Sequence, residues 1–222
     1  MEFRTLLSRH AAVAVEKQLR LARSVAGSSW SWDLAAGTLV IAGTHWSFQL
    51  LGIERAADAR WRWAWADADN GDGDGLPDAL IRAARTLRAF GARQGVRELV
   101  EPEVDLRRAA GQSFAALACG LLDARGFWRA PFDGGVAWLL LTDRAAPGAA
   151  RPLPAEMARV LTRTLAILPV DHAIALDAYV LHHGGSVERA GATATARLRG
   201  GGRMVAHFDE GRRIERLEAK VA

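Results

Sequence analysis

The sequence predicts an α+β protein: a largely antiparallel sheet with one aromatic face packed on helices, plus a C-terminal helix-and-strand unit. Three observations lead to this fold class. Apolar residues recur at helical spacing near the N-terminus, aromatic residues then alternate with polar or small ones, and both patterns return after a segment rich in Pro, Gly and Ala. One-sided alternation of this kind is typical of an antiparallel sheet with one face on a core and the other toward water.

The first segment, from Glu2 to about Val25, predicts an amphipathic helix. No proline or glycine interrupts it before its end. Its apolar positions recur every three or four residues: Phe3, Leu7, Ala11, Ala14, Leu21 and Val25.

Between Ser28 and Ala66 the period of the pattern changes to two, which predicts strands. Six of the eight tryptophans fall in this stretch: Trp30, Trp32, Trp46, Trp61, Trp63 and Trp65. Successive side chains of a strand point to opposite faces, so the indoles of the run RWRWAWAD are expected to emerge together on one side. The turn at residues 35–37 predicts a hairpin between the first two strands.

The rest of the N-terminal part alternates between helix and strand signals. The predicted elements are an acidic loop at 67–75, a helix at 77–93, an ambiguous stretch at 96–106, a short buried helix at 113–124, and a hairpin at 127–143 that turns at Asp133-Gly134-Gly135.

The stretch APGAARPLP, residues 146–154, is the best candidate for a linker. It suggests a first domain at 1–145 and a second at 155–222. The alternative is that the chain forms one continuous domain. Two helices, at about 155–168 and 171–183, are expected after the linker. The tail from Ser186 then returns to strands, and the final segment fits a strand better than a helix.

The tryptophan-rich face allows two interpretations. In the first, the indoles pack on helices and form a core, each burying about 150–250 Å². In the second, they line a pocket that stacks a planar or apolar ligand. A one-sided apolar sheet usually faces a core, yet this face is also where a ligand would most plausibly bind.

The acidic loop partly matches a calcium-binding loop. Asn70, Asp72, Asp74 and Asp78 fall at the first, third, fifth and ninth places of the EF-hand pattern. The twelfth place holds Ile81, so the bidentate carboxylate is missing. Repeated Asp-Gly is also typical of a solvated turn. The sequence leaves calcium binding open, and no metal or other cofactor is predicted.

Catalytic motifs are absent from the sequence. It contains no HExxH, no Gly-x-Ser-x-Gly and no paired cysteines. The nearest candidates for acid–base chemistry are Asp171, His172, Tyr179 and His207, and no spacing rule joins them. Cys119 lies in an apolar run, where a buried and unreactive thiol is expected. An enzyme is therefore not favoured.

The charge and hydropathy patterns limit the expected partners and location. The net charge of +4 comes almost entirely from arginines interleaved with acids, so no nucleic-acid partner is predicted. No apolar run is long enough to cross a bilayer and no secretory leader is evident, so no membrane partner and a cytoplasmic location are expected. The oligomeric state is left open.

The segment WSWDLAAGTL, followed by FQLLGI and RWRWAWAD, resembles an uncharacterised bacterial family, a domain of unknown function with a W-x-W-A-W-A signature. The tail AHFDEGRRIERL is also similar to the family. The resemblance implies a common fold and a bacterial origin, and no activity or site residue.

The sequence thus predicts a non-enzymatic binding module. Its site would be lined by the six tryptophans and would hold a small planar or apolar ligand or a peptide. The alternative is an interaction protein that binds another protein through an exposed surface, without a pocket.

Overall fold

The structure is a computed structural model that describes residues 1–69, 76–143 and 152–220. Its contacts divide the chain into two compact units. The first, Met1–Phe3 with Lys17–Ala145, holds all eight tryptophans and is called the tryptophan unit below. The second, called the C-terminal unit, comprises Arg4–Glu16 and Ala146–Ala222.

The first helix, α1, contributes residues to both units. It spans Phe3–Val25, which confirms the helix predicted from the apolar spacing. Its residues 4–16 group with the C-terminal unit and its residues 17–25 with the tryptophan unit, so the helix does not belong wholly to the N-terminal part.

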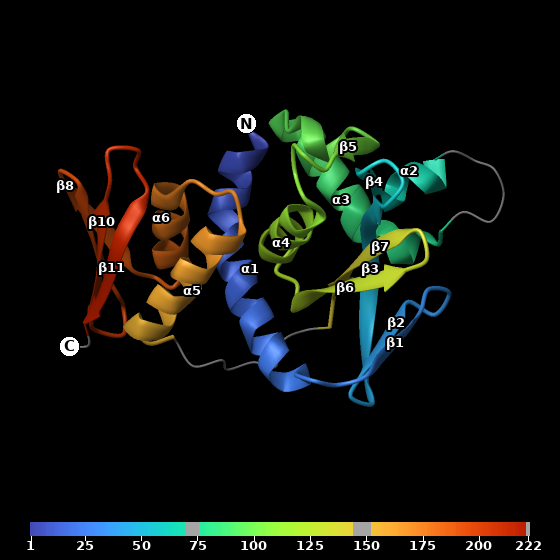
Figure 1. Cartoon of the computed structure of the whole chain (residues 1–222), viewed down its shortest axis with the longest axis horizontal. Helices are drawn as coiled ribbons and strands as arrows, with labels where there is room; N and C mark the ends of the chain where they lie inside the picture. The colour runs from blue at the N-terminus through green and yellow to red at the C-terminus, as the bar shows by residue number, and fades with distance from the viewer. Residues whose placement is uncertain (70–75, 144–151, 221–222) are drawn as a thin grey trace. The chain divides into compact units, whose positions relative to one another are not determined.

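The tryptophan unit is built on a curled, seven-stranded antiparallel sheet (Figure 1). Its strands are β1 (Trp30–Asp33), β2 (Thr38–Ile41), β3 (Thr44–Arg55), β4 (Arg60–Trp63), β5 (Glu103–Asp105), β6 (Gly126–Phe132) and β7 (Gly135–Leu141). The long strand β3 pairs with β2 through its first part, with β4 through its last part, and with β7 along most of its length. Strand β1 pairs with β2, and β6 pairs with β7, which confirms both predicted hairpins.

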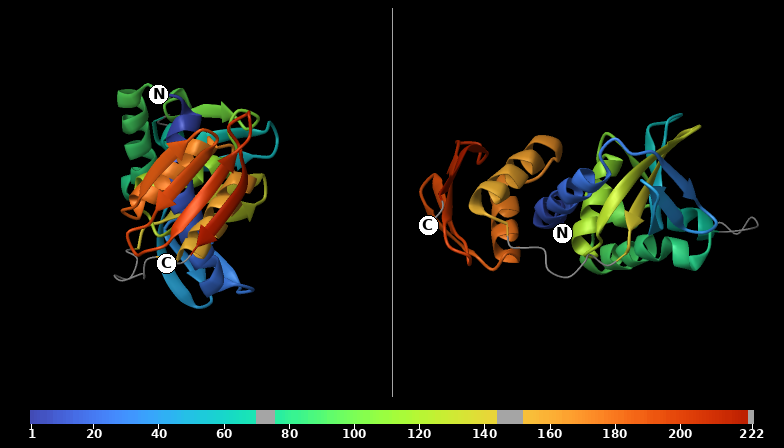
Figure 2. Two further views of the ribbon diagram at one scale, coloured as in Figure 1. Left: turned by 90° about the vertical axis from the view of Figure 1, so that its left-hand side faces the viewer. Right: turned by 90° about the horizontal axis from the view of Figure 1, so that it is seen from below.

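Helices cover the sheet of the tryptophan unit. They are α2 (Ala64–Asp69), α3 (Asp78–Gln94) and α4 (Gly111–Leu121), together with the 3-10 turn η1 (Arg97–Leu99). Helix α3 packs on β3, and α4 packs on β6 and β7 (Figures 1 and 2). The apolar stripe predicted for α3 is buried at Leu80, Ala84 and Leu87, so the fold class predicted from periodicity is correct for this unit.

One strand is shorter than predicted. Strand β4 ends at Trp63, and the next six residues form α2, so Trp65 lies on a helix. Alternation continues through the sequence AWADAD, but alanine favours the helical state. The structure therefore contradicts the prediction that Trp61, Trp63 and Trp65 share one strand face.

The lone cysteine, Cys119, is fully buried in α4, as the sequence predicted. Burial raises the pKa of its thiol to about 12, far above the usual range. We therefore expect no reaction of the native protein with a thiol reagent such as DTNB at pH 8, and rapid reaction in urea. Stoichiometric labelling of the native protein within minutes would contradict this arrangement.

The C-terminal unit pairs helices with a four-stranded antiparallel meander. Its elements after residue 151 are α5 (Pro154–Ile167), α6 (His172–His182), β8 (Ser186–Ala190), β9 (Thr193–Arg197), β10 (Arg203–Phe208) and β11 (Ile214–Lys220). Helices α5 and α6 pack on this sheet (Figure 2). The strand predicted for the final segment is confirmed. The predicted linker at 146–154 lies largely outside the described residues.

Residues 4–16 of α1 are joined to the start of α6 by polar contacts within the C-terminal unit. The Ser8 hydroxyl accepts a hydrogen bond from the Asp171 amide at 2.8 Å. The Arg4 guanidinium donates to the Val170 carbonyl at 3.2 Å. In the described part of the chain, no helix is both long and apolar enough to cross a membrane.

Candidate functional site

The six tryptophans proposed as a site lie in separate environments. Trp61 and Trp63 are fully buried at 0 % exposure and pack around Phe114 of α4. The Phe114 ring centroid lies 4.9 Å from that of Trp61 and 5.1 Å from that of Trp63. Neither indole reaches solvent, so both belong to the core of the tryptophan unit.

Trp46 and Trp65 are also buried, and each lies beneath an arginine. The Arg125 guanidinium carbon is 4.4 Å from the Trp46 ring centroid, and that of Arg88 is 4.1 Å from the Trp65 ring centroid. Stacking of this kind is worth about 0.5–1 kcal/mol at exposed sites and more when desolvated. These arginines therefore shield the indoles from water.

Trp30 and Trp32 on β1 are only half-buried. Trp30 meets Trp128 edge to face, with ring centroids 5.9 Å apart. Trp32 lies against Phe48 of β3, with centroids 6.1 Å apart. Among the six proposed residues, these two indoles are the ones that solvent can reach.

The indole N–H groups are unequally paired. Trp63 Nε1 donates to the Glu98 carbonyl at 3.0 Å. Within the described residues, five other buried indole nitrogens have no acceptor: those of Trp46, Trp61, Trp65, Trp128 and Trp138. An unpaired buried donor costs about 1–3 kcal/mol, so these tryptophans stabilise the unit through buried area rather than through polar contacts.

A hollow of about 350 Å³ opens in the tryptophan unit beside Phe48. It forms where the β1–β2 turn, the middle of β3 and the first turns of α3 meet. The lining residues are Ala35, Ala36, Gly37, Thr38, Ser47, Phe48, Gln49, Pro77, Ala79, Leu80, Arg82 and Thr142. None of them is a tryptophan, but the Phe48 ring joins the hollow to Trp32.

Polar contacts fix the walls of this hollow. Gln49 Oε1 accepts a hydrogen bond from the Ala83 amide of α3 at 2.6 Å, which ties the helix to β3. The Ser47 amide donates to the Asp143 carboxylate at 2.7 Å. Arg82 has neither a side-chain hydrogen bond nor an ion pair with any residue in the described part of the chain. Among the described residues, no carboxylate competes with a ligand for its guanidinium.

Gly37 allows the β1–β2 turn to approach α3 closely. Its φ of +62° lies in the left-handed region, and a Cβ atom there would lie 3.5 Å from Leu80 Cδ1. The backbone of this residue therefore forms one side of the hollow, which a larger side chain would narrow.

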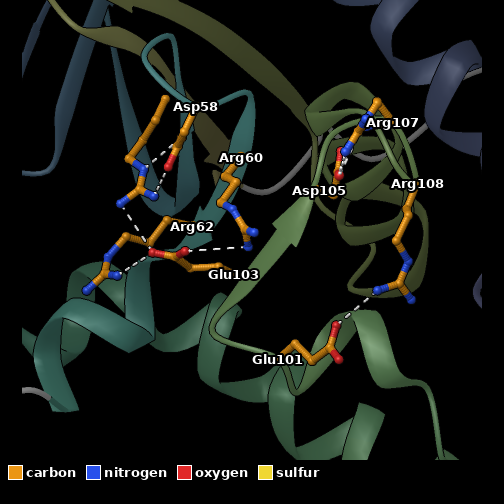
Figure 3. A network of polar contacts seen from close by, with 9 residues as sticks. Asp58, Arg60, Arg62, Glu101, Glu103, Asp105, Arg107 and Arg108 are labelled. Atoms are coloured by element: carbon orange, nitrogen blue, oxygen red, sulfur yellow. Dashed lines mark hydrogen bonds and ion pairs between the residues drawn. The ribbon is translucent and has the colours of Figure 1, made fainter.

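Arginines and carboxylates form a network on the outer side of β4 and β5. Figure 3 shows Glu103 between arginines, with Arg62 Nη1 at 2.7 Å, Arg55 Nη1 at 3.2 Å and Arg60 Nη1 at 3.8 Å from its carboxylate. Arg60 and Arg62 thus point away from Trp61, as strand alternation predicts. Each group has a partner, so we interpret the network as a solvated sheet face and not as a site.

The carboxyl of Asp105 belongs to the same surface. Hydrogen bonds from the Arg107 side chain lower its pKa from 3.8 to about 2. Because the folded pKa is depressed, the contribution of this pair to stability is present above pH 3.8 and is lost as the pH falls toward 2.

We expect Arg107→Gln to raise the pKa of Asp105 toward 3.8 in an NMR titration. Arg108→Gln, which removes the contacts to Glu98 and Glu101, should leave it unchanged.

The acid–base candidates from the sequence lie in the C-terminal unit and serve structural contacts. Asp171 caps α6 by accepting a hydrogen bond from the Ile174 amide at 2.9 Å. His172 Nδ1 accepts from the Ile214 amide at 2.9 Å, and burial lowers the pKa of its imidazole. His207 lies 3.6 Å from Glu218 on the outer face of the sheet.

Tyr179, the remaining candidate, belongs to a cluster that sequence spacing could not reveal. Its hydroxyl donates to Glu16 Oε2 at 2.8 Å, and His183 Nε2 lies 2.9 Å from the same oxygen. Glu16 is 7 % exposed. A buried carboxylate requires such partners, and neither described cavity reaches this cluster.

Metal-binding groups are not apparent in the described segments. There, no three His, Cys, Asp or Glu side chains are arranged to hold a metal ion. Of the residues in the calcium-loop hypothesis, Asn70, Asp72 and Asp74 lie outside the described residues. Asp78 begins α3 and pairs with Arg85 at 2.5 Å.

Comparison with known proteins identifies the family of the chain. Residues 4–144 match DUF6882, a family of unknown function. The match covers more than half of the sequence. The chain belongs to this family. No curated protein and no solved structure matches it.

The DUF6882 match contains the hollow beside Phe48 and all eight tryptophans. It ends before α5, so α5, α6 and the four-stranded sheet lie beyond it. Membership supplies no activity, and the function must be inferred from the hollow itself.

Proposed function

We propose that the tryptophan unit is a non-enzymatic binding module and that it holds a small planar or apolar ligand in the hollow beside Phe48. The observation that carries the proposal is a cavity of about 350 Å³ whose lining includes Arg82, a side chain with no hydrogen bond or ion pair among the described residues. Small-molecule sites are usually clefts of about 300–1,000 Å³ with apolar walls and a few convergent polar groups.

The lining combines apolar side chains with polar ones. Phe48, Leu80 and Pro77 offer the apolar surface against which a planar ligand could pack. The hydroxyl groups of Thr38, Ser47 and Thr142 and the guanidinium of Arg82 can hydrogen-bond to polar atoms of the ligand. A ring that carries one or two hydrogen-bonding substituents matches this combination.

The tryptophans have two roles in this proposal. Trp32 supports the Phe48 ring from the side and is half-buried, so its emission should respond to an occupied hollow. Trp30, Trp46, Trp61, Trp63 and Trp65 maintain the sheet that positions it.

A fluorescence titration tests the proposal. We expect a panel of small planar compounds to contain one class that shifts the tryptophan emission saturably in the full chain. Ala79→Phe should abolish the shift, because Ala79 is exposed and lines the hollow. Ala89→Phe is the matched control: Ala89 is exposed on the same helix, outside the hollow, and should leave binding intact.

Two results would count against a ligand in this hollow. One is a saturable shift that Ala79→Phe and Ala89→Phe leave equally unchanged, which would place the ligand elsewhere. The other is emission that no compound perturbs, which would favour the alternative of a protein-binding surface. We also propose a cytoplasmic location. The proposed function requires no cofactor and no nucleic-acid or membrane partner.

A further inference from the structure

A second hollow, of about 290 Å³, lies in the C-terminal unit. It forms where the β8–β9 turn, the β10–β11 turn and the start of α6 meet. The residues that line it are Ala173, Arg189, Gly191, Ala192, Thr193, Phe208, Asp209 and Arg212. All of these residues lie beyond the DUF6882 match, so the hollow is independent of the site proposed for the tryptophan unit.

Two arginines bring positive charge to this hollow. Arg189 Nη2 donates to Asp177 Oδ1 at 2.7 Å and lies 3.4 Å from the Ala173 carbonyl, which fixes its guanidinium. The side chain of Arg212, in contrast, has no hydrogen bond or ion pair with any described residue. A guanidinium presents five N–H donors in a planar fork that matches a carboxylate or phosphate.

The one carboxylate in the lining is already engaged. Asp209 Oδ1 accepts a hydrogen bond from the Arg213 amide, at 2.6 Å, and its own amide donates to the Arg213 carbonyl at 2.9 Å. Asp209 therefore holds the β10–β11 turn. The pKa of the neighbouring His172 is lowered mainly by burial; Arg213 and Arg4 lower it further, while Asp171 and Asp209 raise it.

The backbone of Arg212 is strained. Its φ of +61° lies in the left-handed region, which side chains other than glycine rarely adopt. The preceding residue is a glycine, Gly211, and it does not have a positive φ. An arginine thus occupies the position of the turn that favours glycine, and such strain often accompanies a functional side chain.

The hollow also offers an apolar surface. The Phe208 ring is half-buried in the lining, and Thr193 places a hydroxyl nearby. The register of the β10–β11 pairing shifts next to Phe208, which pairs with Ile214, and leaves Glu215 of β11 as the extra residue. Such irregularities commonly re-aim a side chain.

We propose that this hollow binds the oxyanion of a small aromatic acid, with Arg212 and Arg189 around the oxyanion and the ligand ring on Phe208. A cavity of 290 Å³ has room for one such ring and its acidic group. The shared chemistry is an oxyanion on a planar group, whether carboxylate or phosphate.

NMR titration of the full chain with benzoate and with phenyl phosphate tests this assignment. We expect at least one of them to shift the amide signals of Gly191, Thr193 and Phe208 saturably, and the tighter binder identifies the oxyanion. Benzamide, which is neutral and of similar shape, should bind at least tenfold more weakly. Equal shifts with benzamide, or no shifts with either acid, would overturn the proposal.

Variants of Arg212 separate binding from folding. Arg212→Gly should weaken binding of the acid at least tenfold, while the melting temperature stays level or rises because glycine relieves the left-handed strain. Arg212→Lys keeps the charge and should retain part of the affinity. Arg203→Gln removes a charge on β10 outside the hollow and should bind as the wild type does. Unchanged binding in Arg212→Gly would refute the role of this residue.

Discussion

Replacing Gly52 with alanine is expected to destabilise the tryptophan unit by about 3 kcal/mol, as overpacking of a rigid core does. Gly52 lies in β3, directly beneath the Trp61 indole. A Cβ atom there would lie 2.5 Å from the Arg62 carbonyl oxygen and 2.6 Å from Trp61 Cζ2. Neither group can move freely, because the carbonyl belongs to the β4 backbone and the indole is fully buried. Urea unfolding followed by tryptophan fluorescence measures the loss, since every tryptophan lies in this unit.

Gly126→Ala is the matched control for this prediction. Gly126 also lies in a strand of the same sheet, but the closest atom to its added Cβ would be Leu21 Cδ2 at 2.9 Å. A leucine methyl group can rotate away, so this substitution should cost about 1 kcal/mol or less. Equal losses in the two variants would show that the β3–β4 contact is more yielding than its distances suggest.

Periodicity predicted most of the fold because each element carries its own local signal. The helical spacing in residues 3–25 and the alternation around Trp46 each correspond to a face that the structure buries, and the alternation around Trp30 corresponds to a half-buried face. The periodic pattern fails to predict the element where the same residues are compatible with both helix and strand. At Trp65 the alternation continues into a sequence that prefers helix, and tertiary packing decides. Strand β8 begins at Ser186, where the sequence predicts the return to strands, although Val187 is the one large apolar side chain in it.

The candidate sites could not be predicted in the same way. The hollow beside Phe48 joins Gly37, Ser47, Leu80 and Thr142, which lie on four separate segments of the chain. No motif or spacing rule connects such residues, and their types are ordinary for turns and helix starts. The concentration of tryptophans points to the tryptophan unit, but burial decides which of the indoles a ligand could reach.

The residues that line the second hollow also come from separate segments of the chain. Arg189 lies in β8 and Arg212 in the β10–β11 turn, and nothing in the sequence marks either as unusual. The left-handed φ of Arg212 is the informative feature, and it is visible only in the structure because glycine, the usual marker, stands one position earlier.

Trp63→Phe is expected to cost about 3 kcal/mol, and Trp61→Phe about 1 kcal/mol less. Both substitutions remove part of a fully buried indole and leave a cavity. They differ in the fate of the indole N–H. Trp63 Nε1 donates to the Glu98 carbonyl, whereas Trp61 Nε1 has no acceptor among the described residues. Losing the first removes a hydrogen bond to the part-buried Glu98 carbonyl, while losing the second removes an unpaired donor. Urea unfolding of the two variants, with equal slopes required for comparison, measures the difference.

Trp138→Phe extends the same comparison. The Trp138 indole is also buried without an acceptor for its nitrogen, and it packs on Phe127 at 5.9 Å. Its loss should therefore resemble that of Trp61→Phe rather than that of Trp63→Phe. If Trp61→Phe and Trp138→Phe cost as much as Trp63→Phe, cavity formation alone would account for all three losses. The hydrogen bond to Glu98 would then contribute nothing measurable, and the tryptophan unit would depend on indole volume alone.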